Sequence, residues 1–153
     1  MRDEVSRYLW SAREAKAEVH RRHLRVRELE ARCAVLTGQG QAPEQARRDL
    51  MAERERELEA IREENRKYRE VEEAIGRLSR SECRVALRLR YLRGLRWRTV
   101  QQEMERAGYY YSDREIFRLH GEALEEMGDF AGRCGGSEQA GSGWQKQGAT
   151  LIP

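Results

Sequence analysis

The sequence predicts an all-α fold, and three observations support this. The 153-residue chain is 37% charged and only 39% hydrophobic, which suits long helices with narrow apolar seams rather than a thick globular core. It contains only two prolines, so few positions interrupt a helix. Apolar residues also recur at alternating steps of three and four from Val5 onward. We predict a coiled-coil helical hairpin over residues 1–78, three short helices over 79–127 and a disordered tail over 128–153.

The first half of the predicted hairpin carries a coiled-coil seam. Two heptad rows start at Val5 and Tyr8, and every position in them except Arg22 is apolar or small. The seam ends at residues 37–43, where two glycines and a proline predict a turn and a new helix start. A second apolar stripe then follows: Met51, Leu58, Ile61, Tyr68, Val71, Ile75 and Leu78. Folding back at the turn gives an antiparallel hairpin, and a single extended dimeric coiled coil is the alternative.

Charge is distributed unevenly along the chain. Residues 1–78 carry 18 basic and 17 acidic side chains, so this part is nearly neutral. Between Arg80 and Arg98 there are seven arginines and a single acid, Glu82. Such a concentration of positive charge indicates a polyanionic partner, although a solvated basic face is the simpler alternative.

The first of the three short helices is predicted over residues 81–93. Ser79 followed three residues later by Glu82 has the pattern of a capping box, and Gly94 is suited to a left-handed helix end. Arginines spaced by four residues along this helix predict one basic stripe: Arg80, Arg84 and Arg88.

The next two helices form a helix–turn–helix pattern. One is predicted over residues 97–107 and ends at Gly108, and the other over 113–127 begins after a second capping box, Ser112 with Glu115. An inward stripe follows the heptad spacing of this last helix: Ile116, Leu119, Ala123 and Met127. Polar and aromatic residues remain on the outer face of its first turns, which is how a recognition helix meets the major groove of DNA.

At these residues the sequence resembles a known family. "LRLRYLRGLRWRTVQQEM" followed by "SDREIFRLHGEAL" is similar to region four of bacterial sigma factors, and more closely to small phage regulators of late transcription of the ArpU/RinA type. The resemblance covers about residues 80–127. It implies that Ser112 is the cap, that Ile116 is a core residue, and that Arg114 and its neighbours contact DNA. Two departures are that the connection "ERAGYYYSD" is longer than the family's turn and that nothing resembles sigma region two.

We therefore predict a sequence-specific DNA-binding transcriptional regulator, encoded by a phage or prophage, that inserts helix 113–127 into the major groove of double-stranded DNA. The predicted base-contacting residues are Asp113, Arg114, Phe117 and Arg118. The predicted backbone-contacting residues are Arg80, Arg84, Arg88, Arg93, Arg96 and Arg98. Further expected partners are RNA polymerase and, because a two-helix seam is marginal alone, a second copy bound through the hairpin.

Two other functions fit the same pattern. A phage DNA-packaging subunit of the small-terminase kind also combines a helix–turn–helix with coiled-coil assembly. The other is a coiled-coil adaptor whose basic segment binds protein or RNA.

Catalysis, metal binding and cofactors are not expected. The sequence has neither a phosphate-cradling glycine loop nor a plausible catalytic triad. His20 and His23 lie three residues apart, but no further ligand completes a metal site. Three widely spaced cysteines, and a start that resembles neither a signal peptide nor a membrane span, predict a cytoplasmic protein.

Overall fold

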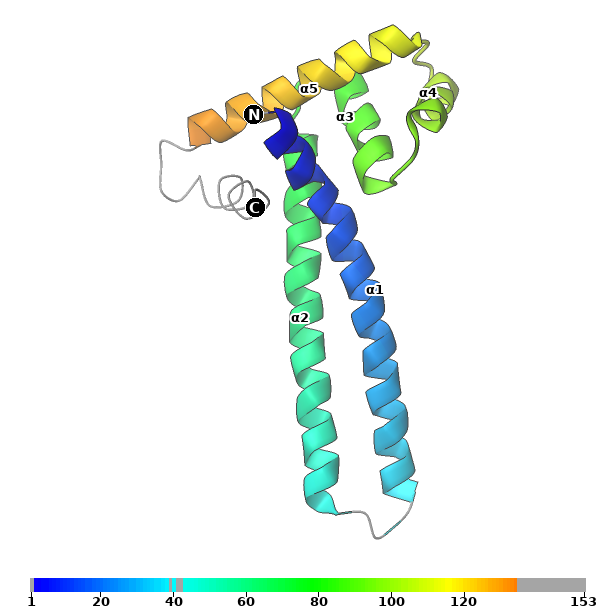
Figure 1. Cartoon of the computed structure of the whole chain (residues 1–153), viewed down its shortest axis with the longest axis vertical. Coiled ribbons are helices and arrows are strands. Elements are labelled where there is room, and N and C mark those ends of the chain that lie inside the picture. Colours follow the sequence, from blue (N-terminus) through cyan, green and yellow to red (C-terminus); the bar gives the residue numbers. More distant parts are fainter. Residues whose placement is uncertain (1, 39, 41–42, 135–153) are drawn as a thin grey trace. The chain divides into compact units, whose positions relative to one another are not determined.

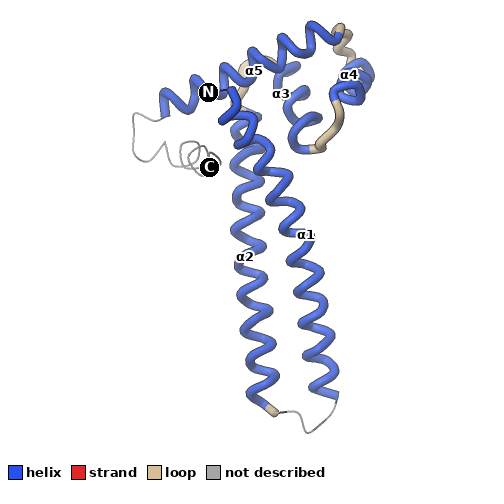
Figure 2. Tube along the Cα trace, in the orientation of Figure 1, coloured by secondary structure: helices blue, strands red, loops and turns tan. Residues whose placement is uncertain are grey.

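The structure is a computed structural model that describes residues 2–38, 40 and 43–134, with side chains described up to residue 129 (Figures 1 and 2). Every regular element in these residues is helical, which confirms the all-α prediction. The elements are α1 (Arg2–Gly38), α2 (Glu44–Gly76), α3 (Ser81–Leu87), the π-helical turn η1 (Arg88–Leu92), α4 (Trp97–Arg106) and α5 (Asp113–Cys134). None of the described helices is long and apolar enough to cross a membrane.

The chain divides into two compact units. We call Glu14–Lys67 the hairpin unit. We call the described residues of Met1–Arg13 and Tyr68–Pro153 the core unit. Both α1 and α2 therefore contribute residues to both units.

In the hairpin unit, α1 and α2 run antiparallel beside each other (Figure 1). Their facing sides bury apolar residues such as Val26, Leu29 and Ile61. Arg22, the one charged residue in the predicted seam, is half-buried and reaches across to the other helix, where its Nη1 donates to Glu57 Oε2 at 2.9 Å. The pairing with Glu57 raises the pKa of Arg22 and keeps its charge compensated at the seam.

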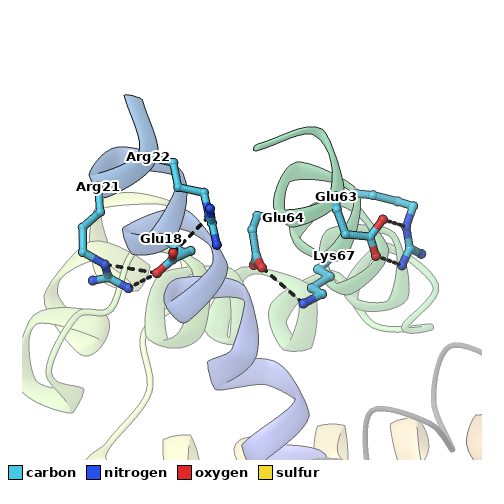
Figure 3. A network of polar contacts seen from close by, with 7 residues as sticks. Glu18, Arg21, Arg22, Glu63, Glu64 and Lys67 are labelled. Carbon is cyan, nitrogen blue, oxygen red and sulfur yellow. Dashed lines mark hydrogen bonds and ion pairs between the residues drawn. The ribbon is translucent and has the colours of Figure 1, made fainter. Parts of the chain in front are cut away.

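Ion pairs cover the polar sides of the hairpin unit (Figure 3). Figure 3 shows Glu18 accepting from both Arg21 and Arg22 on α1, and Lys67 bound to Glu64 on α2. These pairs join neighbouring turns of one helix, which supports helix formation, although each such exposed pair contributes little to stability.

The core unit has a larger interior that draws on every helix. Side chains with 0% exposure come from α1 (Leu9), α2 (Ile75), α3 (Leu87), α4 (Val100) and α5 (Met127). They belong to one continuous cluster of buried residues. The start of α1 and the end of α2 thus pack with α3, α4 and α5, whereas the sequence prediction placed a boundary at residue 78.

Two local predictions differ from the structure. Met51 was predicted in the apolar stripe of the second helix, but it is 47% exposed and its neighbour Leu50 is the buried residue. The tail was predicted to start at residue 128, yet α5 continues to Cys134. Gly128 is buried beside Met127, so the helix still packs against the core at this point. The rest of the predicted tail lies outside the described residues.

The predicted first capping box is also wrong. The N-cap of α3 is Arg80, and no side chain caps it. Ser79 instead uses its N–H and its hydroxyl to bind the two carboxylate oxygens of Glu126, at 2.9 and 3.0 Å. A serine followed by glutamate has the local capping pattern, but here the serine is recruited by a carboxylate far along the chain.

The predicted helix 81–93 is interrupted by the π-helical turn. Arg93 N–H donates to Arg88 O at 3.0 Å, a five-residue spacing that widens the helix locally. Gly94 follows with a φ of +69°, the left-handed conformation predicted for it.

Candidate nucleic-acid interface

The start of α5 is held by reciprocal hydrogen bonds. Glu115 N–H donates to Ser112 Oγ at 3.3 Å, and Ser112 N–H donates to Glu115 Oε1 at 3.1 Å, as a capping box requires. Hydrogen bonds from Ser112 to the Glu115 carboxylate, first of all from the Ser112 backbone N–H, lower the pKa of Glu115, so it stays ionised beside the positive end of the helix dipole. The first turn of α5 is therefore fixed in place.

The first two turns of α5 divide into an inner and an outer face. Ile116 and Leu119 are buried in the core. The four predicted base-contacting residues all remain exposed on one contiguous surface: Asp113, Arg114, Phe117 and Arg118. Their spacing by three and four residues makes them neighbours on the helix surface.

Phe117 is an exposed aromatic residue that is nonetheless supported from behind. Phe117 lies on the outer face of α5 and is 54% exposed. Its ring nevertheless makes an edge-to-face contact with the Trp97 ring, with 5.4 Å between the ring centroids and 64° between the ring planes. Trp97 is in turn held by the Arg90 guanidinium at 4.9 Å and by His120 at 4.6 Å. On its other side, Arg90 lies over the ring of Trp10 at 5.1 Å.

His120 is a structural residue of the core unit. Its Nε2 lies 2.7 Å from the Tyr91 hydroxyl, which is itself 3.2 Å from Ser6 Oγ. Burial, with smaller contributions from Arg90 and Arg2, lowers the pKa of His120 from its ordinary value of 6.5 to about 4. The imidazole is therefore neutral at physiological pH and packs as part of the interior.

The long connection between α4 and α5 is organised by its tyrosines. Gly108 turns the chain with a φ of +96°. Tyr109 and Tyr111 stack on each other and reach α3, where their hydroxyls bind Ser81 Oγ at 3.0 Å and Glu82 Oε2 at 3.2 Å. Gln101 Nε2 donates to the carbonyl of Tyr111 at 2.9 Å and ties the connection to α4.

Two of the predicted backbone-contacting arginines are engaged within the protein. Arg84 is half-buried and donates to the carbonyl of Leu78 at 2.5 Å, so it stabilises the turn before α3. Arg80 Nη1 donates to Glu122 Oε2 at 2.8 Å. The remaining four are exposed and, among the described residues, make no ion pair or side-chain hydrogen bond: Arg88, Arg93, Arg96 and Arg98.

The start of α4 joins the outer face of α5 in one surface. A cavity of about 380 Å³ is lined from α4 by Trp97, Arg98 and Gln101, and from α5 by Asp113, Ile116 and Phe117. Arg96 is the N-cap residue of α4 and its side chain makes no capping bond. The surface between the two helix starts is therefore concave, polar and flanked by free guanidinium groups.

Negative charge increases along α5. Its first two turns carry Arg114 and Arg118 together with Asp113 and Glu115, so their charges balance, whereas the following turns carry Glu122, Glu125 and Glu126. Glu122 binds Arg80 and lies 4.0 Å from Arg118 Nε. Since carboxylates repel phosphate, the first half of the helix, where two arginines offset two acids, suits a polyanion better than the acidic second half.

Sequence reasoning did not assign a role to Arg90 or Trp97. Both residues lie in the basic segment, and nothing in their local spacing indicates that the Arg90 guanidinium contacts the indole rings of both Trp10 and Trp97. Among the described residues, no three His, Cys, Asp or Glu side chains lie together in a way that would hold a metal ion. Comparison of the chain with protein-family models, with curated proteins and with solved structures finds no match.

Proposed function

We propose that this chain is a sequence-specific DNA-binding transcriptional regulator, encoded by a phage or prophage, that places the first half of α5 in the major groove. One observation carries the proposal: the exposed surface formed by Asp113, Arg114, Phe117 and Arg118 lies on the first turns of a capped helix and continues onto the start of α4. In a helix–turn–helix, the first turns of the second helix contact base edges and the preceding helix contacts the backbone.

The side chains on this surface suit base recognition. Arginine can bind guanine O6 and N7 with two hydrogen bonds, and an aspartate can accept from cytosine N4. Arg114 and Arg118 lie four residues apart on the outer face, so both can enter one groove. The capping box at Ser112 holds their helix in a fixed position before DNA arrives.

The free arginines suit the phosphate backbone. We assign phosphate contacts to four arginines that are exposed and make no ion pair among the described residues: Arg88, Arg93, Arg96 and Arg98. Arg80 can join them only by releasing Glu122 and Glu82, and Arg84 is better explained by its bond to the Leu78 carbonyl. Phosphate contacts position a protein on DNA without reading its sequence.

The proposal is tested by selecting binding sites from randomised DNA with the unsubstituted protein and with Arg114→Ala and Arg118→Ala. Each variant is expected to lose preference at one base pair, with a discrimination of ~1–3 kcal/mol, while the fold is kept. The exposed Arg56 of the hairpin unit supplies a matched control, and Arg56→Ala should select the original site. If the unsubstituted protein enriches no sequence, or if both variants recover the same site unchanged, α5 is not the reading helix.

A second measurement tests the backbone contacts. If the four arginines assigned to phosphate contacts each neutralise one phosphate, the logarithm of the binding constant should fall with the logarithm of salt concentration at a slope of roughly −3 to −4 per protomer. Replacing both Arg96 and Arg98 with Ala should make the slope less negative by about two and weaken every DNA sequence alike. A binding constant that does not respond to salt contradicts this assignment.

A feature of the hairpin unit favours a protein partner as a second function. A cavity of about 720 Å³ opens between its helices and is lined largely by apolar side chains such as Ala31, Val35 and Leu50. Val35 is 61% exposed there. This surface suits an adaptor role in which the hairpin binds RNA polymerase or a second copy of the chain. Replacing Val35 with Asp should abolish that association in a sedimentation or pull-down measurement while leaving DNA binding intact.

A further inference from the structure

Phe117 differs from the other residues of the proposed DNA surface because it is apolar. Only a few large hydrophobic side chains of the described residues are exposed, and Phe117 is one of them at 54%. It lies between Arg114 and Arg118 on the outer face of α5. A single exposed apolar residue is ordinary, but one with two arginines, Arg114 and Arg118, beside it will be covered when a polyanion binds them.

The Phe117 ring is also held in a defined direction. Its edge-to-face contact with Trp97 at 5.4 Å restricts it from behind. Trp97 itself contacts the Arg90 guanidinium at 4.9 Å and the His120 ring at 4.6 Å, and both contacts restrict its movement. The ring therefore loses little conformational freedom when it contacts a ligand, and its position relative to Arg114 and Arg118 is preset.

We propose that Phe117 recognises the C5-methyl group of thymine, so that the protein prefers a thymine next to the bases read by its arginines. This inference rests on the proposed function and extends it to one specific base. The methyl group of thymine is the apolar feature that base pairs present in the major groove, and phenylalanine is among the side chains that contact it. The adjacent Arg114 and Arg118 favour DNA, rather than an apolar protein surface, as the partner that covers Phe117. A protein that covered Phe117 would also have to compensate the charges of these two arginines.

The test replaces thymine with deoxyuridine, which differs only by the missing methyl group. Starting from the selected binding site, each thymine is replaced in turn and the dissociation constant is measured. Removing one buried methyl group should weaken binding about fourfold, and we expect this loss at one thymine or at two adjacent ones. Phe117→Ala should bind the two forms of the site equally, and Phe117→Leu, which keeps an apolar side chain, should retain part of the difference.

Tyr110→Ala is the matched control, because Tyr110 is an aromatic residue of the α4–α5 connection that is 78% exposed and lies outside this surface. It should keep the full sensitivity to deoxyuridine. Thermal unfolding of each variant shows whether loss of the Phe117–Trp97 contact has altered the fold, and Phe117→Leu decides the case if Phe117→Ala has. The inference is overturned if no thymine in the selected site is sensitive, or if Phe117→Ala remains as sensitive as the unsubstituted protein. Either result leaves the roles of Arg114 and Arg118 standing, whereas failure to select any site removes the proposed function itself.

Discussion

The hairpin unit and the core unit use arginine in different ways. In the hairpin unit, Arg22 and Arg25 each bind a glutamate on the facing helix, at 2.9 and 2.8 Å, and so compensate charge along a thin seam. In the core unit, Arg90 packs between two tryptophan rings, while Arg96 and Arg98 stay exposed. Charges that lie at the seam between two helices are paired across it, whereas arginines on the solvent-facing surface of the core unit can remain without an ion pair.

The two units also differ in how their apolar residues are surrounded. Leu87 of α3 lies in a cluster that receives side chains from every helix of the core unit. Leu29 of the hairpin unit is equally buried, with 1% exposure, but only two helices enclose it. The neighbours of Leu29 can therefore relax more readily than those of Leu87.

We expect the largest loss of stability when Leu87 or Leu29 is replaced by alanine, and the two variants compare the two units directly. Leu87→Ala should lower the free energy of unfolding by about 4 kcal/mol, and Leu29→Ala by about 2 kcal/mol, because the cost of a cavity depends on how far its surroundings collapse. Urea unfolding followed by circular dichroism measures both. An equal or larger loss for Leu29→Ala would mean that the hairpin unit is packed as rigidly as the core unit.

The second largest effect is expected in the pH dependence of stability, which should depend on His120 of the core unit. The pKa of His120 is lowered to about 4 by burial and by Arg90 and Arg2, so the unfolded chain binds a proton that the folded chain refuses. Stability should therefore be complete above pH 6.5 and fall as the pH decreases towards 4, by roughly 2 kcal/mol once the partial exposure of the ring is taken into account.

His120→Gln should flatten this dependence, since glutamine does not titrate and can still bind the Tyr91 hydroxyl. His23→Gln is the matched control, because His23 is an exposed histidine of the hairpin unit. Thermal unfolding at a series of pH values would contradict the assignment if the control lost as much of the slope as His120→Gln.

A smaller effect is expected at the start of α5. Ser112→Ala removes the hydroxyl that accepts from Glu115 N–H and should lower stability by about 1 kcal/mol. DNA affinity should fall with it, and the preferred base at each position should stay the same, because the cap touches no base. A changed preference in the randomised-DNA selection would show that Ser112 itself takes part in reading.

The smallest effect is expected in the hairpin unit. Glu57→Gln removes the charge that faces Arg22 across the seam, and Arg22 keeps its ion pair with Glu18 at 3.0 Å. We expect a change in the unfolding midpoint smaller than that of Ser112→Ala, and one that shrinks as salt is added. A large loss that salt does not reduce would show that the seam depends on this charge more than on its apolar residues.

Sequence periodicity predicted the helical elements because helix formation is largely local. The spacing of Ile116, Leu119, Ala123 and Met127 was enough to identify the buried face of α5, and each of these residues is at most 3% exposed. The left-handed turns at Gly94 and Gly108 were also predictable, because a positive φ favours glycine whatever surrounds it.

Other features depend on residues far apart in the sequence. Ser79 and Ser112 both precede a glutamate by three residues, yet only Ser112 forms a capping box, because Glu126 lies within reach of Ser79. Likewise, Leu50 is buried and Met51 is exposed although both are apolar, since the position of the facing helix decides which side of α2 is covered.

The amino-acid sequence by itself thus determined the all-helical character of the chain, the buried face of α5, the basic block and the residues on the outer side of α5, because these follow from spacing, composition and local backbone preference. Only the tertiary structure decided which arginines remain free and which support the fold. Arg84 and Arg96 cannot be distinguished in the sequence, since both belong to the same basic segment. In the structure Arg84 donates to the Leu78 carbonyl, whereas Arg96 faces solvent. The same holds for the support of Phe117 by Trp97, Arg90 and His120, which three separate segments bring together. Contacts of this kind depend on packing between helices, and no local pattern encodes them.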